Sequence, residues 1–176
     1  MSRLEQLLLF ILDRAKKADI ENLSKFQLLK IPYLIQIESI KYTGSPFMTS
    51  ITFMRDNNGP ISIDIYNSIN KLFKDGYIKI ENTKTKGYKY ERTCHSLAKK
   101  VPKLDFSPSE TIFLDSILSD ILPLSQIKLK KVAYDTEPMK EITSKEKKEV
   151  IRKGEIIDFS KVTVDSDIID SYADAI

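Results

Sequence analysis

Residues 59–93 read GPISIDIYNSINKLFKDGYIKIENTKTKGYKYERT, and this segment decides the fold. Its first half has apolar residues at helical spacing, which predicts a helix over about Ser62–Asp75. Gly76 suits the left-handed residue that ends such a helix. Two short alternating segments, 77–81 and 88–92, flank a loop that contains glycine and predict a β-hairpin. A helix followed by a hairpin is typical of the last half of a winged helix-turn-helix, which serves either to bind nucleic acid or as the scaffold of a protein-binding domain.

The rest of the chain is predicted to be helical, because serine and threonine caps precede most of the apolar runs. The predicted helices begin at Ser2, Ser24, Ser107, Ser125 and Thr143, and the last of them (SKEKKEVIRK) ends at Gly154. The helix at 62–75 is expected to bury Ile61, Ile65, Ile69, Leu72 and Phe73. We predict a mainly α fold with a small β-hairpin (α+β), a helical bundle that contains a winged-helix-like helix plus hairpin. Residues 1–154 would form a single domain with the hairpin at about 77–92, and 155–176 an acidic C-terminal tail or short terminal helix.

Composition excludes several classes of protein. The chain has 176 residues, a formal net charge of +3, one cysteine and one histidine. A single cysteine cannot form an internal disulfide, which suits a reducing compartment. The apolar run near the N-terminus is interrupted by charges and is far shorter than the ~20 residues that span a membrane. We therefore predict a cytoplasmic protein with no membrane partner.

Catalytic and metal-binding motifs are absent from the sequence. It contains no phosphate-binding loop, dinucleotide fingerprint, HExxH zinc motif or nucleophile elbow. Cys94 and His95 are neighbours, and adjacent residues of a strand point to opposite faces, which argues against a catalytic pair. We predict no enzyme, no catalytic residue, no cofactor and no metal ligand.

Positive charge is concentrated in the hairpin and its flanks. Between Lys71 and Lys103 there are ten basic and three acidic residues, an excess of seven in a chain whose total is +3. Phosphate contacts supply most non-specific DNA affinity, so a basic wing points to DNA. The predicted nucleic-acid contacts are Lys84, Lys86, Lys89, Arg92, Asn67, Asn70 and Lys71. Against this, Asp64 would repel phosphate, and a solvated lysine-rich face is the alternative interpretation.

Several motifs in order resemble those of a known family. KIPYLIQ (30–36) resembles the Lys-Leu-x-Tyr-Leu-x-Gln core of the first conserved helix in Panacea domains, the SocA-like antitoxin family. GSPF (44–47) is similar to that family's Gly-x-Pro-Leu-Phe turn, and FMRDNNGPISIDIY (53–66) to its Gly-Pro signature before a helix. LKKVAYDTEP (129–138) resembles the closing segment. The resemblance covers about 24–142.

The resemblance implies a mainly helical antitoxin that neutralises a toxin protein by direct binding and needs no cofactor. Two positions depart from the family pattern: Tyr134 stands near its usual histidine, and Met139 replaces a tryptophan. Aromatic side chains anchor protein interfaces. The predicted partner contacts are Tyr33, Tyr42, Tyr88 and Tyr90, whereas Phe47 and Tyr66 are expected in the core. A DNA-binding transcriptional regulator is the alternative function, and self-association into a homo-oligomer stays open.

Overall fold

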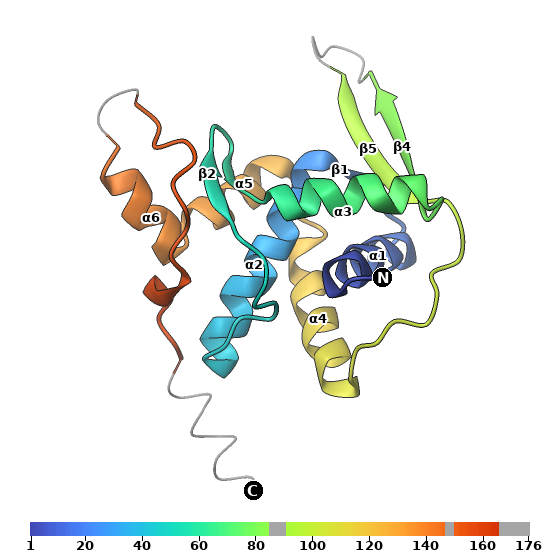
Figure 1. Ribbon diagram of the computed structural model, residues 1–176, viewed down its shortest axis with the longest axis horizontal. Helices are drawn as coiled ribbons and strands as arrows, with labels where there is room; N and C mark the ends of the chain where they lie inside the picture. The colour runs from blue at the N-terminus through green and yellow to red at the C-terminus, as the bar shows by residue number, and fades with distance from the viewer. Residues whose placement is uncertain (85–90, 147–149, 166–176) are drawn as a thin grey trace, which may run out of the picture.

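The computed structural model describes residues 1–84, 91–146 and 150–165 (Figure 1). Within them the chain is α+β, as predicted, with helices around two small antiparallel sheets. The elements are α1 (Arg3–Lys17), β1 (Leu23–Ser24), α2 (Lys25–Thr43), β2 (Met54–Asp56), β3 (Gly59–Ile61), α3 (Ile63–Lys74), β4 (Ile78–Thr83), β5 (Arg92–Leu97), α4 (Pro108–Ile121), α5 (Gln126–Tyr134), α6 (Glu137–Ser144) and the 3-10 helix η1 (Phe159–Lys161).

Local capping signals place the helix starts where the sequence predicts them. α1, α2 and α4 each begin with a capping box in which the N-cap serine accepts from the third residue of the helix, and Ser125 caps α5. Pro108 opens α4, where its missing N–H costs nothing. α3 runs from Ile63 to Lys74, and Gly76 follows it with a φ of +69°, as predicted.

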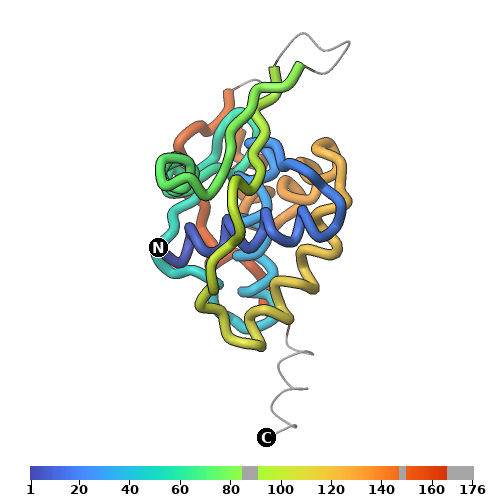
Figure 2. Tube along the Cα trace, turned by 90° about the vertical axis from the view of Figure 1, so that its right-hand side faces the viewer, coloured from blue at the N-terminus to red at the C-terminus, as the bar shows by residue number. Residues whose placement is uncertain are grey.

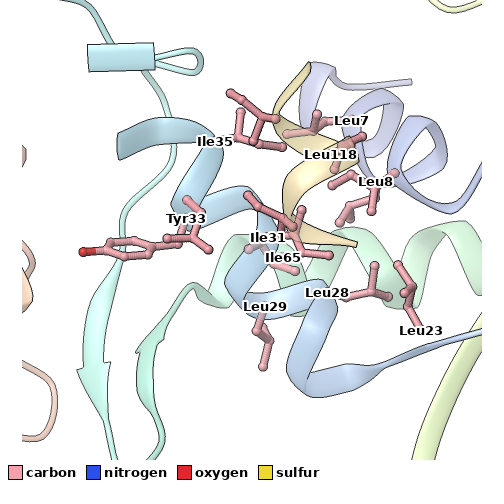
Figure 3. Packing of buried hydrophobic residues seen from close by; sticks show 14 of the residues in the cluster. Leu7, Leu8, Leu23, Leu28, Leu29, Ile31, Tyr33, Ile35, Ile65 and Leu118 are labelled. Carbon is pink, nitrogen blue, oxygen red and sulfur yellow. The ribbon is translucent and has the colours of Figure 1, made fainter. Parts of the chain in front are cut away.

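α2 lies at the centre of the core. Thirteen of its nineteen residues are buried, so it packs against neighbours on nearly every side. In Figure 3, Ile31 and Ile35 of α2 lie among leucines of α1, Leu118 of α4 and Ile65 of α3. Figure 1 shows α2 between the C-terminal segment on one side and α1 and α4 on the other.

The larger sheet has the order β1-β5-β4, with all neighbours antiparallel. In the hairpin, Ile78 pairs with Leu97 and Thr83 with Arg92, so the second strand starts at Arg92. The predicted strand at 88–92 overlaps β5 only at Arg92: residues 88–90 lie outside the described residues, and Glu91 is not in a strand. β5 continues beyond the predicted end to Leu97 and pairs with β1 through Cys94 and His95. The smaller sheet is a hairpin of β2 and β3 across Asn57 and Asn58, where the sequence predicts a turn.

Two expectations about helices are wrong. Phe73 was expected in the buried face of α3, but 50% of its surface is exposed in the last turn. No helix runs from Thr143 to Gly154 through the described residues, because Thr143 belongs to the last turn of α6 and 150–154 are not helical. Tertiary bonds override the local cap signal: Glu146 pairs with Arg55 instead of capping a helix.

The segment after α6 returns to the smaller sheet. Ile157 N donates to Phe53 O (2.9 Å) and Gly154 N to Arg55 O (2.7 Å), so this segment runs antiparallel beside β2. Ile157 and Val162 then join the core, and Asp165 N donates to Lys41 O (2.9 Å). None of the helices in the described part of the chain is long and apolar enough to cross a membrane.

Candidate partner-binding surface

Three polar side chains of α2, spaced three residues apart, each hold a different segment of the chain. The Lys30 ammonium donates to Pro60 O (2.6 Å) and so fixes β3. The Gln36 amide donates to Met48 O (2.6 Å) and accepts from Met48 N (2.8 Å), which fixes the loop after α2. These are the polar residues of the KIPYLIQ motif, and their contacts give that motif a structural role.

The third of these side chains, Tyr33, holds the junction between α5 and α6. Its hydroxyl lies 2.6 Å from that of Thr136, which donates to Ala133 O (2.8 Å). Because the Thr136 hydroxyl has one proton, Tyr33 is the donor in their bond. Burial raises the pKa of Tyr33, so the phenol stays neutral. Tyr33 has no exposed surface and packs against Phe53 and Phe159, so it serves the core and not an accessible partner surface.

Lys30 is the least exposed charged side chain among the described residues. Only 1% of it is exposed, and its acceptor is a neutral carbonyl. Burial lowers the pKa of Lys30 to about 7, against an opposing effect of Asp56, and the nearby Lys130 and Arg55 lower it further. The sequence predicts no site role for Lys30, although its position inside the apolar run 28–37 could have indicated burial.

Replacing Lys30 with methionine is expected to flatten the pH dependence of stability between pH 7 and 9. In that window the unfolded chain binds a proton that folded Lys30 does not, so the wild-type free energy of unfolding rises with pH, at most by about 1.4 kcal/mol per pH unit. Urea unfolding at several pH values measures the slope. The exposed Lys103→Met variant should keep the wild-type slope, and an unchanged slope in Lys30→Met would contradict the assignment.

A second buried cluster joins β2 to the end of α6. Arg55 Nε donates to Glu146 Oε1 (2.8 Å) and Nη2 to Oε2 (3.2 Å), while Nη1 donates to the Tyr134 hydroxyl (2.9 Å). The bond from Arg55 holds the pKa of Glu146 below its ordinary value. Gly59 lies against the Tyr134 ring, where a β-carbon would come within 2.8 Å of Cε2. No sequence motif indicates this cluster, because Arg55 and Glu146 lie 91 residues apart.

The loop 44–52 borders two open clefts and is tied to α2 through Gln36. Phe47 stacks on Phe113 (6.0 Å between centroids), and the Arg3 guanidinium lies 5.0 Å from the centre of the Phe47 ring. Met48 is held by Gln36, whereas Thr49 and Ser50 are exposed. The loop is therefore anchored at its buried residues and open at its tip.

Two clefts lie on either side of this loop and share Met48, Thr49 and Ile51. One, of about 420 Å³, is bounded by the start of α1 and by Asp64, Asn67 and Ser68 of α3. The other, of about 360 Å³, is bounded by the end of α2 and by Phe159, Ser160, Val162 and Val164 of the C-terminal segment. Both are open and partly apolar, which suits contact with a protein surface.

The structure separates the predicted partner tyrosines. Tyr42 is 40% exposed near the end of α2 and is available for contact, in contrast to the buried Tyr33. Tyr88 and Tyr90 lie outside the described residues. Phe47 and Tyr66, expected in the core, are half-buried and pack against it.

The predicted nucleic-acid contacts are only partly brought together. Asn67 and Asn70 are exposed on α3, but Lys71 is tied to Glu5 of α1 (3.0 Å), and this bond raises the pKa of Lys71. Arg92 donates to the Gln27 side chain (3.0 Å), and Lys84 faces Glu91 at 3.9 Å. Lys86 and Lys89 lie outside the described residues.

Cys94 and His95 occupy adjacent positions of β5, and both are buried. His95 Nδ1 lies 3.4 Å from Leu23 O, and the Thr83 hydroxyl lies 3.5 Å from Cys94 Sγ. Burial lowers the pKa of His95. Across residues 1–84, 91–146 and 150–165, no group of three or more histidine, cysteine or acidic residues is placed to hold a metal ion.

Comparison with known proteins identifies the family. The family model described as "Antitoxin SocA-like, Panacea domain" matches residues 28–140, more than half of the chain. No curated protein and no solved structure matches significantly. The matched range contains the three polar side chains of α2, the loop 44–52 and Gly59. The chain therefore belongs to the family of SocA-like antitoxins with a Panacea domain.

Proposed function

We propose that the protein is a non-catalytic antitoxin that neutralises a toxin protein by binding it directly. The family match over residues 28–140 carries this proposal. The two clefts beside the loop 44–52 and the exposed Tyr42 offer the contact surface, because a loop anchored beside partly apolar clefts binds with little loss of conformational freedom.

The gene next to that of this chain tests the proposal. Expressed alone it should arrest growth, and co-expression with this chain should restore growth and give a complex that co-purifies in a fixed ratio. A harmless neighbouring gene whose product does not co-purify would count against direct neutralisation. Restored growth without a complex would show that the chain acts by another route.

The variant Thr49→Arg is expected to weaken the complex at least tenfold, because a long charged side chain at the loop tip would fill the mouths of both clefts. Isothermal titration calorimetry with the purified neighbouring gene product measures the loss. Ser116→Arg, an equal change at an exposed position of α4, serves as the matched control and should bind like the wild type. If the wild type, Thr49→Arg and Ser116→Arg bind with equal affinity, the interface does not include the tip of the loop 44–52.

A second candidate function is DNA-binding transcriptional regulation by a winged helix. The observation that favours it is the chain order: β1 follows α1 and pairs with β5, and α3 leads directly into the β4–β5 hairpin. In winged helix-turn-helix proteins, a helix at the place of α3 enters a DNA groove and the hairpin lies along the backbone. The ion pair between Lys71 and Glu5 leaves Asn67 and Asn70 as the exposed polar groups to read bases.

Changing Lys84, Lys86 and Lys89 to glutamate together is expected to abolish a salt-sensitive gel shift with the promoter of the protein's own gene. The three changes remove positive charges from the wing and replace them with charges that repel phosphate. A scrambled promoter of equal length shows how much of the shift depends on sequence. If the wild-type protein shifts neither DNA at low salt, the second candidate function is wrong.

A further inference from the structure

Exposed positive charges lie around the first turn of α2, on elements outside the β4–β5 hairpin as well as on β5. Lys25 lies in this turn, which contains no acidic residue. On one side, Arg92 at the start of β5 donates to the Gln27 side chain (3.0 Å). On the other side, Gln126 at the start of α5 donates to the Ser24 hydroxyl (3.0 Å). These two bonds bring β5 and α5 against the same turn of α2.

α5 contributes the largest share of this charge. It has three lysines and no acidic residue between Gln126 and Tyr134. Lys128 and Lys131 are exposed, whereas Lys130 is half-buried and donates to the Asn58 side chain (3.4 Å). We call Arg92, Lys25, Lys128 and Lys131 together the cation belt.

The cation belt differs from the other charged surfaces in how its charges are balanced. Lys71, Lys84 and Lys145 each lie within ion-pair distance of a glutamate. Of the carboxylates that the structure describes, none forms an ion pair with a member of the cation belt. No direct ion pair therefore neutralises these four charges, which leaves them available to attract a polyanion.

We propose that the cation belt binds the phosphate backbone of double-stranded nucleic acid and extends the contact from the hairpin to α5. This inference rests on the second candidate function. Figures 1 and 2 show α3, the hairpin and α5 toward the same end of the molecule, with α3 and α5 on opposite sides of the hairpin in Figure 2. A duplex that receives the hairpin along its backbone would meet α3 on one side and α5 on the other.

A duplex fits this surface better than an acidic protein partner. The belt spreads four positive charges over β5, α2 and α5, which suits a ligand that carries negative charge at regular intervals over a long distance. Lys25 Nζ also lies 4.5 Å from the centre of the Tyr66 ring on α3, which links the belt to the helix that would face the groove. Such contacts position the protein without reading sequence.

Salt dependence measures the number of phosphate contacts, and the test uses it. The variant Lys25→Gln/Lys128→Gln/Lys131→Gln removes three charges of the belt. Fluorescence anisotropy with a 30-base-pair duplex between 50 and 200 mM salt should show that the slope of log affinity against log salt falls by about 2.7, since each phosphate contact contributes about 0.9. The affinity at 100 mM salt should fall by about a hundredfold. The loss should be equal for promoter and unrelated duplexes.

The matched control is Lys16→Gln/Lys103→Gln/Lys140→Gln, which removes three exposed lysines from other segments. Its slope of log affinity against log salt should differ from that of the wild type by less than the contribution of one phosphate contact, about 0.9. Both triple variants should unfold at the wild-type temperature, because all six side chains are exposed. If the belt variant keeps the wild-type slope while the hairpin variant loses binding, the belt inference is wrong and the second candidate function stands.

Two further outcomes complete the test. If the wild-type protein binds no duplex at 50 mM salt, the second candidate function and the belt inference fail together, and the antitoxin proposal is untouched. If polyglutamate of equal charge displaces the duplex as well as unlabelled duplex does, the belt recognises acidic chains in general, and the assignment to nucleic acid is overturned.

Discussion

Replacing Gly59 with alanine is expected to lower the free energy of unfolding by about 3 kcal/mol, which corresponds to a fall in Tm of about 6–12 °C. Two effects add. Gly59 has a φ of +95°, where a residue with a side chain is strained by about 1–2 kcal/mol. The new β-carbon would also lie 2.8 Å from Tyr134 Cε2, and Arg55 restrains that ring through its hydroxyl.

Gly76→Ala provides the matched control for this prediction. Gly76 has a φ of +69°, but no atom lies within 4 Å of the position of an added β-carbon. Replacing Gly76 with alanine therefore measures the backbone strain alone and should lower the free energy of unfolding by about 1–2 kcal/mol. In a Tyr134→Ala background, Gly59→Ala should cost no more than Gly76→Ala, because the clash is gone. If the two glycine variants lose the same free energy of unfolding in the wild-type background, the Tyr134 ring moves aside without a measurable energetic penalty, and the predicted clash is wrong.

Replacing Glu146 with alanine is expected to cost about 3 kcal/mol, because it leaves the Arg55 guanidinium buried without its carboxylate. The side chain of Arg55 is only 4% exposed, and the Tyr134 hydroxyl does not balance its charge. Chemical denaturation measures the loss. Glu141→Ala removes the half-exposed partner of Lys145 from the same region and should lower the free energy of unfolding far less, because solvent screens this ion pair.

The pH dependence of the Glu146 contribution follows from its lowered pKa. Because folding lowers this pKa, the stabilisation is fully present above the ordinary glutamate pKa and is lost as pH falls through the folded value. Glu146→Gln should therefore show a shallower loss of stability below about pH 4.5 than the wild type. A steeper acid loss in the variant would contradict the role of this carboxylate.

Local features of the sequence predict the helix starts and turns well. Ser2, Ser24 and Ser107 form capping boxes with side chains three residues away, so their conformation is decided within one turn. The Asn57-Asn58-Gly59 turn and Gly76 are equally local. The helix predicted from Thr143 fails for the opposite reason: Glu146 bonds to Arg55, 91 residues away, and no local pattern encodes that contact.

The candidate site is harder to predict than the fold. The KIPYLIQ motif indicates the family, but its residues hold the structure together and do not form the surface: Lys30 and Tyr33 are buried because their partners come from β3 and Thr136. One cleft beside the loop 44–52 depends on the start of α1 lying beside α3, and the other depends on the C-terminal segment lying beside the end of α2. Hydrophobic patterning reveals neither arrangement. The excess of basic residues along the sequence indicates the basic hairpin. It does not indicate α5, because α5 is brought to the same surface only by tertiary contacts such as the bond from Gln126 to Ser24.

The contacts of α2 have a consequence for how the chain folds during synthesis. The bond between Tyr33 and Thr136 closes over 103 residues, and the core also needs Ile157 and Val162. At about 5–20 residues per second, a ribosome takes about 5–20 seconds to make the 103 residues between these partners. Through that interval the nascent chain exposes the apolar run around Tyr33, which chaperones and proteases recognise. Slower translation between Tyr33 and Thr136 should therefore lengthen the time during which the nascent chain is open to aggregation.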